Sequence, residues 1–417
     1  MRRSKLLVFD AFNKTEEDVR VRTNTGGLIS IGCVVLTCFL LLREWYQFNE
    51  IITRPKLVVD RDHDLELDLN FDITFPSISC DLLTLDILDD AGDLQLDLLE
   101  SGLTKTRVDS NGVSLTTESF NIGNEALIKR DFPQDYCGSC YGALDQGKND
   151  ELNANEKVCC QTCEDVHDAY LNIGWAFYDG KNIEQCETEG YVDRINEHLN
   201  EGCRVQGSAR LNRVQGNIHF APGKSYQDYS RRNSFATHFH DTSLYDKTHS
   251  LSFNHIIHHF SFGKPIENSY VNNHNEGLSK ISTNPLDGRK VFPDRDSHFI
   301  QYSYFAEIVP TRYEYLNNKS DPVETTQFSA TFHSRPLRGG RDEDHPTTLH
   351  QRGGIPGLFI YFETSPLKVI NKEQYSQAWS TFLLNCITTI GGILAVGTSF
   401  DKITYKAQRT IWGKKNK

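Results

Sequence analysis

Residues 65–75 read LELDLNFDITF, with an apolar side chain at every second position from Leu65 to Phe75. Alternation with a period of two is typical of a β-strand that has one face in a core and one face in water. The pattern continues in residues 83–100, LTLDILDDAGDLQLDLLE, across a turn predicted at residues 89–92. These segments predict a mainly β protein whose strands carry solvated carboxylates on their outer faces.

More strands are predicted on either side of this core. Strand-like patterns occupy residues 209–220, 299–310, 327–333 and 358–362, and helical periodicity is confined to residues 165–177, 191–200 and the apolar ends. We therefore expect an antiparallel β-sandwich with a cysteine-rich insertion at residues 137–186.

Two apolar stretches enclose this body. Residues 26–46 and 379–400 each have the length of roughly 20 residues that a helix needs to cross a bilayer. We expect both to be transmembrane helices, with residues 47–378 forming one domain between them. Aromatic residues at their edges, such as Trp45, Tyr46 and Trp379, are typical of spanning helices at the membrane–water interface.

Charge predicts the orientation. Six basic residues lie in residues 1–25 and six in residues 401–417, whereas the chain as a whole carries a net charge of −12. Because basic flanks stay on the cytosolic side, we expect both termini to be cytosolic and residues 47–378 to be luminal. The acidic balance argues against a nucleic-acid partner.

The cysteines support a luminal body. Three of the eleven lie in the apolar stretches, and the other eight are Cys80, Cys137, Cys140, Cys159, Cys160, Cys163, Cys186 and Cys203. In an oxidising lumen these eight are expected to form disulfides, with Cys80 and Cys203 placed beside strands as a candidate clamp. The sequence leaves their connectivity open.

Three interpretations compete for the cysteine-rich insertion. The motif Cys137-Gly-Ser-Cys140 has redox spacing, although no βαβ pattern surrounds it, and would make the protein a membrane-anchored thiol-disulfide oxidoreductase. Together with Cys160 and Cys163 the same motif has the spacing of a zinc ribbon. We favour a disulfide-stapled loop that presents a binding surface, without cofactor or metal.

Histidines form a second cluster. His238, His240, His249, His255, His258 and His259 fall within one short segment. A metal site could use His238-x-His240 or the run from His255 to His259, but no HExxH pattern marks a metalloprotease. Strand and turn histidines on a solvated face are one interpretation. The other is a pH-sensing surface made by His238, His240, His255, His258 and His259, because imidazole titrates in the secretory pH range.

The remaining short motifs concern targeting and modification. No nucleophile elbow, phosphate loop or other catalytic signature occurs, so we expect no enzymatic activity. Asn318-Lys319-Ser320 is a luminal glycosylation acceptor. Lys414 and Lys415 lie four and three residues from the carboxyl end, which is the spacing of a dilysine retrieval signal on a cytosolic tail.

Longer motifs resemble a known family. They include FDAFNKTEEDVRVRTNTGG (9–27), GCRVQGSARLNRVQGNIHFAPGKSY (202–226), LSFNHIIHHFSFGKPI (251–266) and IPGLFIYFETSPLKVI (355–370). These resemble the ER–Golgi intermediate compartment protein family, also called the ER vesicle protein family, along essentially the whole chain. The cysteine-rich insertion is similar to that of the family's larger type, ER vesicle protein 46, rather than of its smaller partner.

The resemblance implies a cargo receptor that cycles between the endoplasmic reticulum and the Golgi in coated vesicles. It implies a complex with the smaller homologous member, contacts of the cytosolic tails with COPI and COPII coat subunits, and retrieval of escaped luminal residents. By resemblance, the insertion with Cys137, Cys140, Cys159, Cys160 and Cys163 is the candidate cargo-binding element. The same resemblance implies residence in the membranes of the endoplasmic reticulum, the intermediate compartment, the Golgi and transport vesicles.

Overall fold

The computed structural model comprises two compact units. One is formed by residues 1–55, 315–320 and 372–417, and the other by residues 56–314 and 321–371. The structure describes residues 24–61, 66–90, 102–110, 112–115, 120–121, 136–152, 156–228, 237–264, 284–293, 297–316, 322–341, 349–350 and 352–413.

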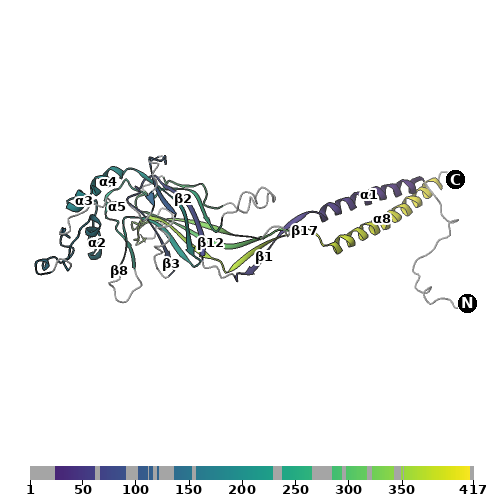
Figure 1. The fold of residues 1–417 in the computed structure, drawn as a ribbon. Coiled ribbons are helices and arrows are strands. Elements are labelled where there is room, and N and C mark those ends of the chain that lie inside the picture. Colours follow the sequence, from purple (N-terminus) through teal and green to yellow (C-terminus); the bar gives the residue numbers. More distant parts are fainter. Residues whose placement is uncertain are drawn as a thin grey trace, which may run out of the picture. The chain divides into compact units, whose positions relative to one another are not determined.

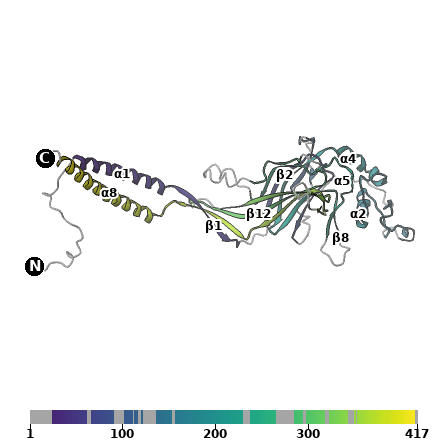
Figure 2. The same cartoon turned by 180° about the vertical axis from the view of Figure 1, so that it is seen from behind.

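Two long helices make up most of the first unit. Helices α1 (Asn24–Phe48) and α8 (Trp379–Gly413) lie side by side in both views (Figures 1 and 2). The ring of Phe48 packs 4.8 Å from Trp379 and 4.9 Å from Phe382, and the Asn385 amide donates to the Glu44 carboxylate at 2.6 Å. Both helices are apolar and long enough to cross a membrane, as predicted, although α8 continues beyond Phe400.

Most of the strands belong to the second unit, and the longer ones form two large sheets (Figure 1). The first sheet has the order β1 (Ile51–Val59), β17 (Leu367–Tyr375), β12 (Ile300–Glu314), β16 (Gly357–Thr364), β7 (Gly216–Pro222) and β3 (Leu83–Asp89), with β13 (Val323–Pro336) also paired to β12. The second has the order β11 (Arg289–Val291), β10 (His255–Phe262), β2 (Glu66–Phe75), β6 (Gly202–Asn212), β4 (Leu103–Val108) and β5 (Phe120–Asn121).

Short strands complete the β structure. Strands β8 (Ser225–Asp228) and β9 (Thr237–His240) form one antiparallel pair, and β14 (Gly340–Arg341) and β15 (Leu349–His350) form another.

The two large sheets enclose the core that the alternating pattern predicted. In β2 the side chains of Leu67, Leu69, Phe71, Ile73 and Phe75 are all buried in one cluster with residues of β3, β7 and β16. Burying one such side chain contributes about 1.5–3 kcal/mol, so this face dominates the stability of the body. The predicted mainly β sandwich is confirmed.

Among the strand pairs whose register the structure describes, one differs from the antiparallel expectation. Strands β12 and β16 are parallel, with Gln301 opposite Gly357. The reason is that β13 runs back along β12 until Pro336 lies opposite Ile300. The chain therefore returns to the starting end of β12 before it enters β16.

Residues 209–220 were predicted as one strand and form parts of two. Strand β6 ends at Asn212, a bend follows, and β7 begins at Gly216 in the other sheet. The Cys80–Cys203 disulfide, the candidate clamp, ties β6 to the segment between β2 and β3. The segment predicted as a strand after residue 90 lies outside the described residues.

Helices gather at one end of the sandwich (Figure 1): α2 (Cys163–Ile173), α3 (Glu184–Thr188), α4 (Tyr191–His198) and α5 (Ser243–Lys247). The predicted helices at 165–177 and 191–200 are confirmed as α2 and α4. Helix α2 begins with a capping box, in which the Thr162 hydroxyl accepts from Asp165 N and the Asp165 carboxylate accepts from Thr162 N. It ends at Gly174 in the left-handed conformation.

At Gly207 the backbone of β6 closely approaches Gly102, the residue before β4. The φ of Gly207 is +148°, and a Cβ there would lie 2.2 Å from the Gly102 carbonyl oxygen. We expect Gly207→Ala to lower the free energy of unfolding by roughly 3 kcal/mol, because the backbone has to separate. The matched control is Gly353→Ala, whose Cβ meets nothing within 4 Å. Thermal unfolding of the full chain in detergent measures both, and equal midpoints would contradict the prediction.

Candidate functional site

Three disulfides hold the cysteine-rich insertion: Cys137–Cys159, Cys140–Cys160 and Cys163–Cys186. Both cysteines of the CGSC motif thus pair outside the motif, not with each other. The redox and zinc-ribbon interpretations each need free sulfur atoms, which this pairing does not provide. The structure therefore gives both interpretations no support and matches the disulfide-stapled loop that the sequence favoured.

The insertion has a small core of its own. Its buried residues are Cys140, Ala143, Cys160, Cys163, Val166, Ala169, Phe177, Ile183 and Cys186. Buried Gln185 crosslinks the loop, since its amide nitrogen donates to Ser139 O at 2.8 Å and to Cys160 O at 2.9 Å. Covalent bridges and buried amide hydrogen bonds therefore compensate for a core with few large apolar side chains.

Charged contacts fasten α2 to the sandwich side of the molecule. The Lys224 ammonium lies 2.7 Å from both Glu164 and Asp168. Burial lowers the pKa of Lys224, but hydrogen bonds to these two carboxylates outweigh it and raise the pKa overall. His167 lies 3.0 Å from the Asp241 carboxylate and stacks on Phe177. These contacts fix the insertion relative to the start of β8 and the end of β9.

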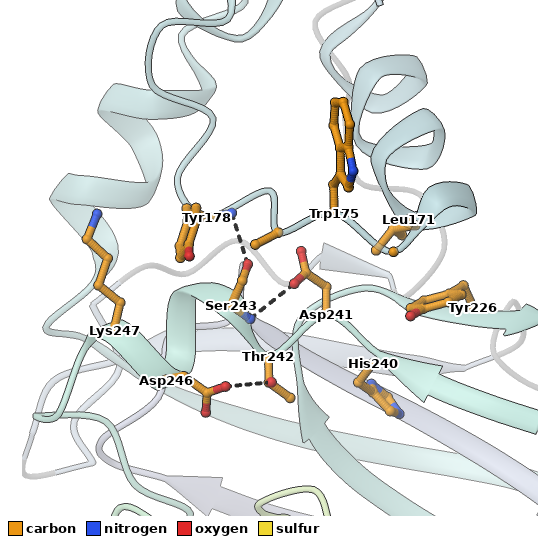
Figure 3. A pocket seen from close by; sticks show the side chains of 12 residues that line it. Leu171, Trp175, Tyr178, Tyr226, His240, Asp241, Thr242, Ser243, Asp246 and Lys247 are labelled. Atoms are coloured by element: carbon orange, nitrogen blue, oxygen red, sulfur yellow. Dashed lines mark hydrogen bonds between the residues drawn. The ribbon is translucent and has the colours of Figure 1, made fainter. Parts of the chain in front are cut away.

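A pocket of about 620 Å³ opens where the insertion meets β8, β9 and α5. Figure 3 shows the segment after α2, with Trp175 and Tyr178, on one side, and the segment from β9 to α5 on the other. Tyr178 N donates to Ser243 Oγ at 2.9 Å, and the Lys247 ammonium lies 5.4 Å from the Tyr178 ring. The side chains of Trp175 and Tyr178 are about half exposed and lie beside charged groups. Such aromatic rings suit the recognition of a protein surface.

A buried polar cluster lies beneath this pocket. Asp86 of β3 and His219 of β7 are cross-strand neighbours on the face opposite the core. The β8–β9 pair covers this face and contributes His238 and His240. His240 is also a wall residue of the pocket (Figure 3).

The four side chains approach one another closely. The Nε2 atoms of His238, His240 and His219 lie 3.1, 3.2 and 3.6 Å from Asp86 Oδ2. His240 Nε2 is also 3.1 Å from the Nε2 atoms of His219 and His238. Four donor atoms within 4.8 Å of one another, three imidazole nitrogens and a carboxylate oxygen, are a set that could hold a metal ion.

Burial and hydrogen bonding set the charges in this cluster. Burial raises the pKa of Asp86, but hydrogen bonds with His238 and His240 outweigh it and hold the pKa well below its usual range. Burial lowers the pKa of His219 to about 3, so this ring is neutral at pH values near 7.

The predicted pH-sensing histidines separate in the structure. His238 and His240 belong to the buried cluster. His255 is fully buried, with Nε2 3.0 Å from the Tyr304 hydroxyl and Nδ1 2.9 Å from Phe253 O. Exposed His258 contacts Thr74 Oγ1 at 2.9 Å, and His259 contacts Asp287 at 3.1 Å. The five do not form one surface.

Two residues of the cluster were not predicted from the sequence. Asp86 was interpreted as one of the solvated carboxylates, and His219 lies outside the histidine-rich segment. The sequence signal for these two residues was that each alternates with apolar core residues of its strand, which places it on the outer face. The sequence did not show that the two strands become neighbours. The predicted glycosylation residue Asn318 and the retrieval residues Lys414 and Lys415 lie outside the described residues.

Two family models match this chain. One, described as "Endoplasmic reticulum vesicle transporter", matches residues 140–401, and one described as "Endoplasmic Reticulum-Golgi Intermediate Compartment (ERGIC)" matches residues 6–96. The "ER-derived vesicles protein ERV46" of Saccharomyces cerevisiae is 62% identical over 424 residues, covering 100% of both chains.

More distant relatives match over most of the chain. The "ER-derived vesicles protein 41" of Schizosaccharomyces pombe is 25% identical over 405 residues, which cover 96% of this chain and 91% of that relative. Among solved structures, "Crystal Structure of Erv41p" is 19% identical, covers 76% of this chain and 99% of that chain, and has a TM-score of 0.36.

His255 predicts how acid affects stability. Burial lowers its pKa to about 4, whereas an unfolded histidine titrates near ~6.5. The unfolded state therefore binds more protons between these values. Stability from this residue is complete above about pH 6.5 and is lost as the pH falls toward 4, by roughly 2 kcal/mol between pH 7 and 5.

We expect His255→Gln to flatten the fall of the unfolding midpoint between pH 7 and 5, measured on the full chain in detergent. His258→Gln, on the exposed side of the same strand, is the control and should leave the slope unchanged. A His255→Gln slope equal to that of the unmodified chain would show that other groups cause the loss.

Proposed function

The chain belongs to the endoplasmic reticulum vesicle transporter family, as the ER vesicle protein 46 type, and from this membership we propose that it is a cargo receptor. In this proposal it binds luminal proteins, including escaped residents of the endoplasmic reticulum, and returns them from the Golgi in coated vesicles. The observation that carries the proposal is the 62% identity to an ER-derived vesicle protein along the full chain. No enzymatic step is part of it.

The proposed topology places both termini in the cytosol. Its support is the pair of apolar helices, Gly26–Phe48 and Trp379–Thr404, together with the basic residues that flank them. The second unit then lies in the lumen, where the four disulfides are stable. The cytosolic ends would be free to contact COPI and COPII coat subunits.

The proposed cargo surface combines the insertion with its pocket. The disulfides of the insertion hold the segment after α2 in place, and this segment carries exposed Trp175 and Tyr178. Rigid aromatic side chains bury large areas at little cost in conformational entropy, which suits them to anchor a partner. Cys137, Cys140, Cys159, Cys160 and Cys163 act in this proposal by shaping the surface.

The proposed partner is a smaller member of the same family. This rests on the family resemblance and on the existence of relatives such as the protein named ER-derived vesicles protein 41. Exposed His258 and partly exposed His259 are the residues that we propose for pH-dependent cargo binding, because a cargo protein can reach them at the surface.

The aromatic surface gives a test of cargo recognition. We expect Trp175→Ala combined with Tyr178→Ala to release soluble luminal residents into the medium, at several times the level of unmodified cells, with normal amounts of the receptor. The control is Phe292→Ala, a similarly exposed aromatic residue directly after β11. Quantitative mass spectrometry of the medium measures the effect. Equal secretion from both variants would place cargo binding elsewhere.

The carboxyl tail gives a separate test of retrieval. Lys414→Ser with Lys415→Ser removes two charges that a coat subunit would contact, and we expect the protein to shift from the endoplasmic reticulum to the Golgi at steady state. Lys402→Ser with Lys406→Ser removes the same charge closer to the membrane and should leave the distribution unchanged. Microscopy with compartment markers measures both variants. If the two variants have the same distribution, the tail acts only as a basic membrane flank and carries no retrieval signal.

A further inference from the structure

The buried cluster of Asp86, His219, His238 and His240 has the geometry of a tetrahedral metal site. A zinc ion with nitrogen and oxygen ligands at 2.0–2.1 Å places neighbouring ligand atoms about 3.3 Å apart. Five of the six separations between the donor atoms lie between 3.1 and 3.6 Å, and all four atoms lie within 4.8 Å of one another. Small shifts of the His219 and His238 side chains would bring all four atoms to ligand distance from one ion, with the strands left in place.

The elements that carry the ligands explain this convergence. Asp86 and His219 are directly opposite each other in the β3–β7 pair, on the face turned away from the core. His238 and His240 are two residues apart in β9 and so point to the same side of that strand. One pair of metal-ligating side chains thus comes from β3 and β7, and the other pair comes from β9, which covers them.

Without a cation the contacts of His240 are poorly matched. Its Nδ1 lies 3.4 Å from the Gly223 carbonyl, which favours a proton on Nδ1 and a lone pair on Nε2. That lone pair faces the Asp86 carboxylate oxygen and two further imidazole nitrogens. One proton cannot satisfy all of these acceptors, whereas a divalent cation satisfies them together.

Burial and the surrounding contacts fit a metal site as well. The side chains of Asp86 and His240 are 2% and 0% exposed. The second carboxylate oxygen of Asp86 accepts a hydrogen bond from Ser225 Oγ at 3.1 Å, which orients the first oxygen toward the imidazoles. The ring of His219 stacks on Phe359, with centroids 5.1 Å apart. The ionised Asp86 and neutral His219 are the protonation states that ligation requires.

We propose that Asp86, His219, His238 and His240 bind one divalent transition-metal ion of the zinc class. Three imidazoles and a carboxylate suit zinc, and four protein ligands leave no open position, so the ion is structural. It fastens the β8–β9 pair to the outer face of β3 and β7. This proposal does not rest on the proposed cargo-receptor function. The metal measurements test the site alone, and the secretion measurements test the receptor function alone.

The test uses the full chain purified in detergent and measures bound metal directly. We expect about one zinc per chain by elemental mass spectrometry. His238→Gln combined with His240→Gln should reduce zinc content more than about tenfold. The control, His258→Gln combined with His259→Gln, removes the same number of imidazoles from β10 and should keep the ion.

Cobalt substitution identifies the ligands. Cobalt(II) in the chelated and reloaded chain should show the visible bands of a tetrahedral site without a thiolate-to-cobalt charge-transfer band. Asp86→Asn provides a second test in case the double histidine variant fails to fold. It keeps the shape of the side chain, removes the carboxylate ligand and should therefore weaken cobalt binding. Chelation should also lower the unfolding midpoint of the unmodified chain, and added zinc should restore it.

Two outcomes would overturn the proposal. One is an unmodified chain that holds no zinc and shows no tetrahedral cobalt spectrum after loading. The other is a thiolate charge-transfer band, which would assign the metal to cysteines instead of this cluster.

Discussion

The structure depends on the apolar face that the two large sheets share. Because side chains alternate along a strand, every residue placed in this core fixes the opposite orientation of its neighbours. Leu85 and Ile87 are buried in the core, so Asp86 lies on the outer face, and Ile218 and Phe220 place His219 there in the same way. A register shift of one residue in either strand would exchange these faces. The polar cluster is therefore positioned by the hydrophobic core behind it.

The cysteine-rich insertion follows a different principle of construction. Its core is small, and three disulfides together with the buried amide of Gln185 supply the constraint that apolar area supplies elsewhere. The ion pairs of Lys224 and the contact of His167 with Asp241 then hold α2 against the sandwich. A rigid segment with exposed aromatic residues results, although the surrounding sequence is rich in polar residues. Rigidity of this kind lowers the entropic cost of binding a partner.

Local patterns in the sequence predicted much of this arrangement. The alternation in residues 65–75 identified β2, helical periodicity identified α2 and α4, and the strand-adjacent positions of Cys80 and Cys203 suggested their disulfide. Features that depend on which strands become neighbours were not predictable in this way. The parallel pairing of β12 with β16, the division of residues 209–220 between two sheets and the meeting of Asp86 with His238 all arise from long-range topology. Asp86 has the local sequence pattern of a solvent-exposed carboxylate, although the β8–β9 pair covers it in the structure.

The covered cluster also determines how the pocket is held. A two-stranded pair as short as β8–β9 is marginally stable by itself, so it needs contacts to the sheet beneath it. Its contacts there run through Ser225, His238 and His240 to Asp86. The same pair supplies Tyr226 and His240 to the pocket and leads directly into Asp241, which binds His167 of the insertion. An ion at the cluster would therefore stabilise the base of the candidate cargo surface without touching cargo, because it joins the pocket's β8–β9 side to the sandwich core.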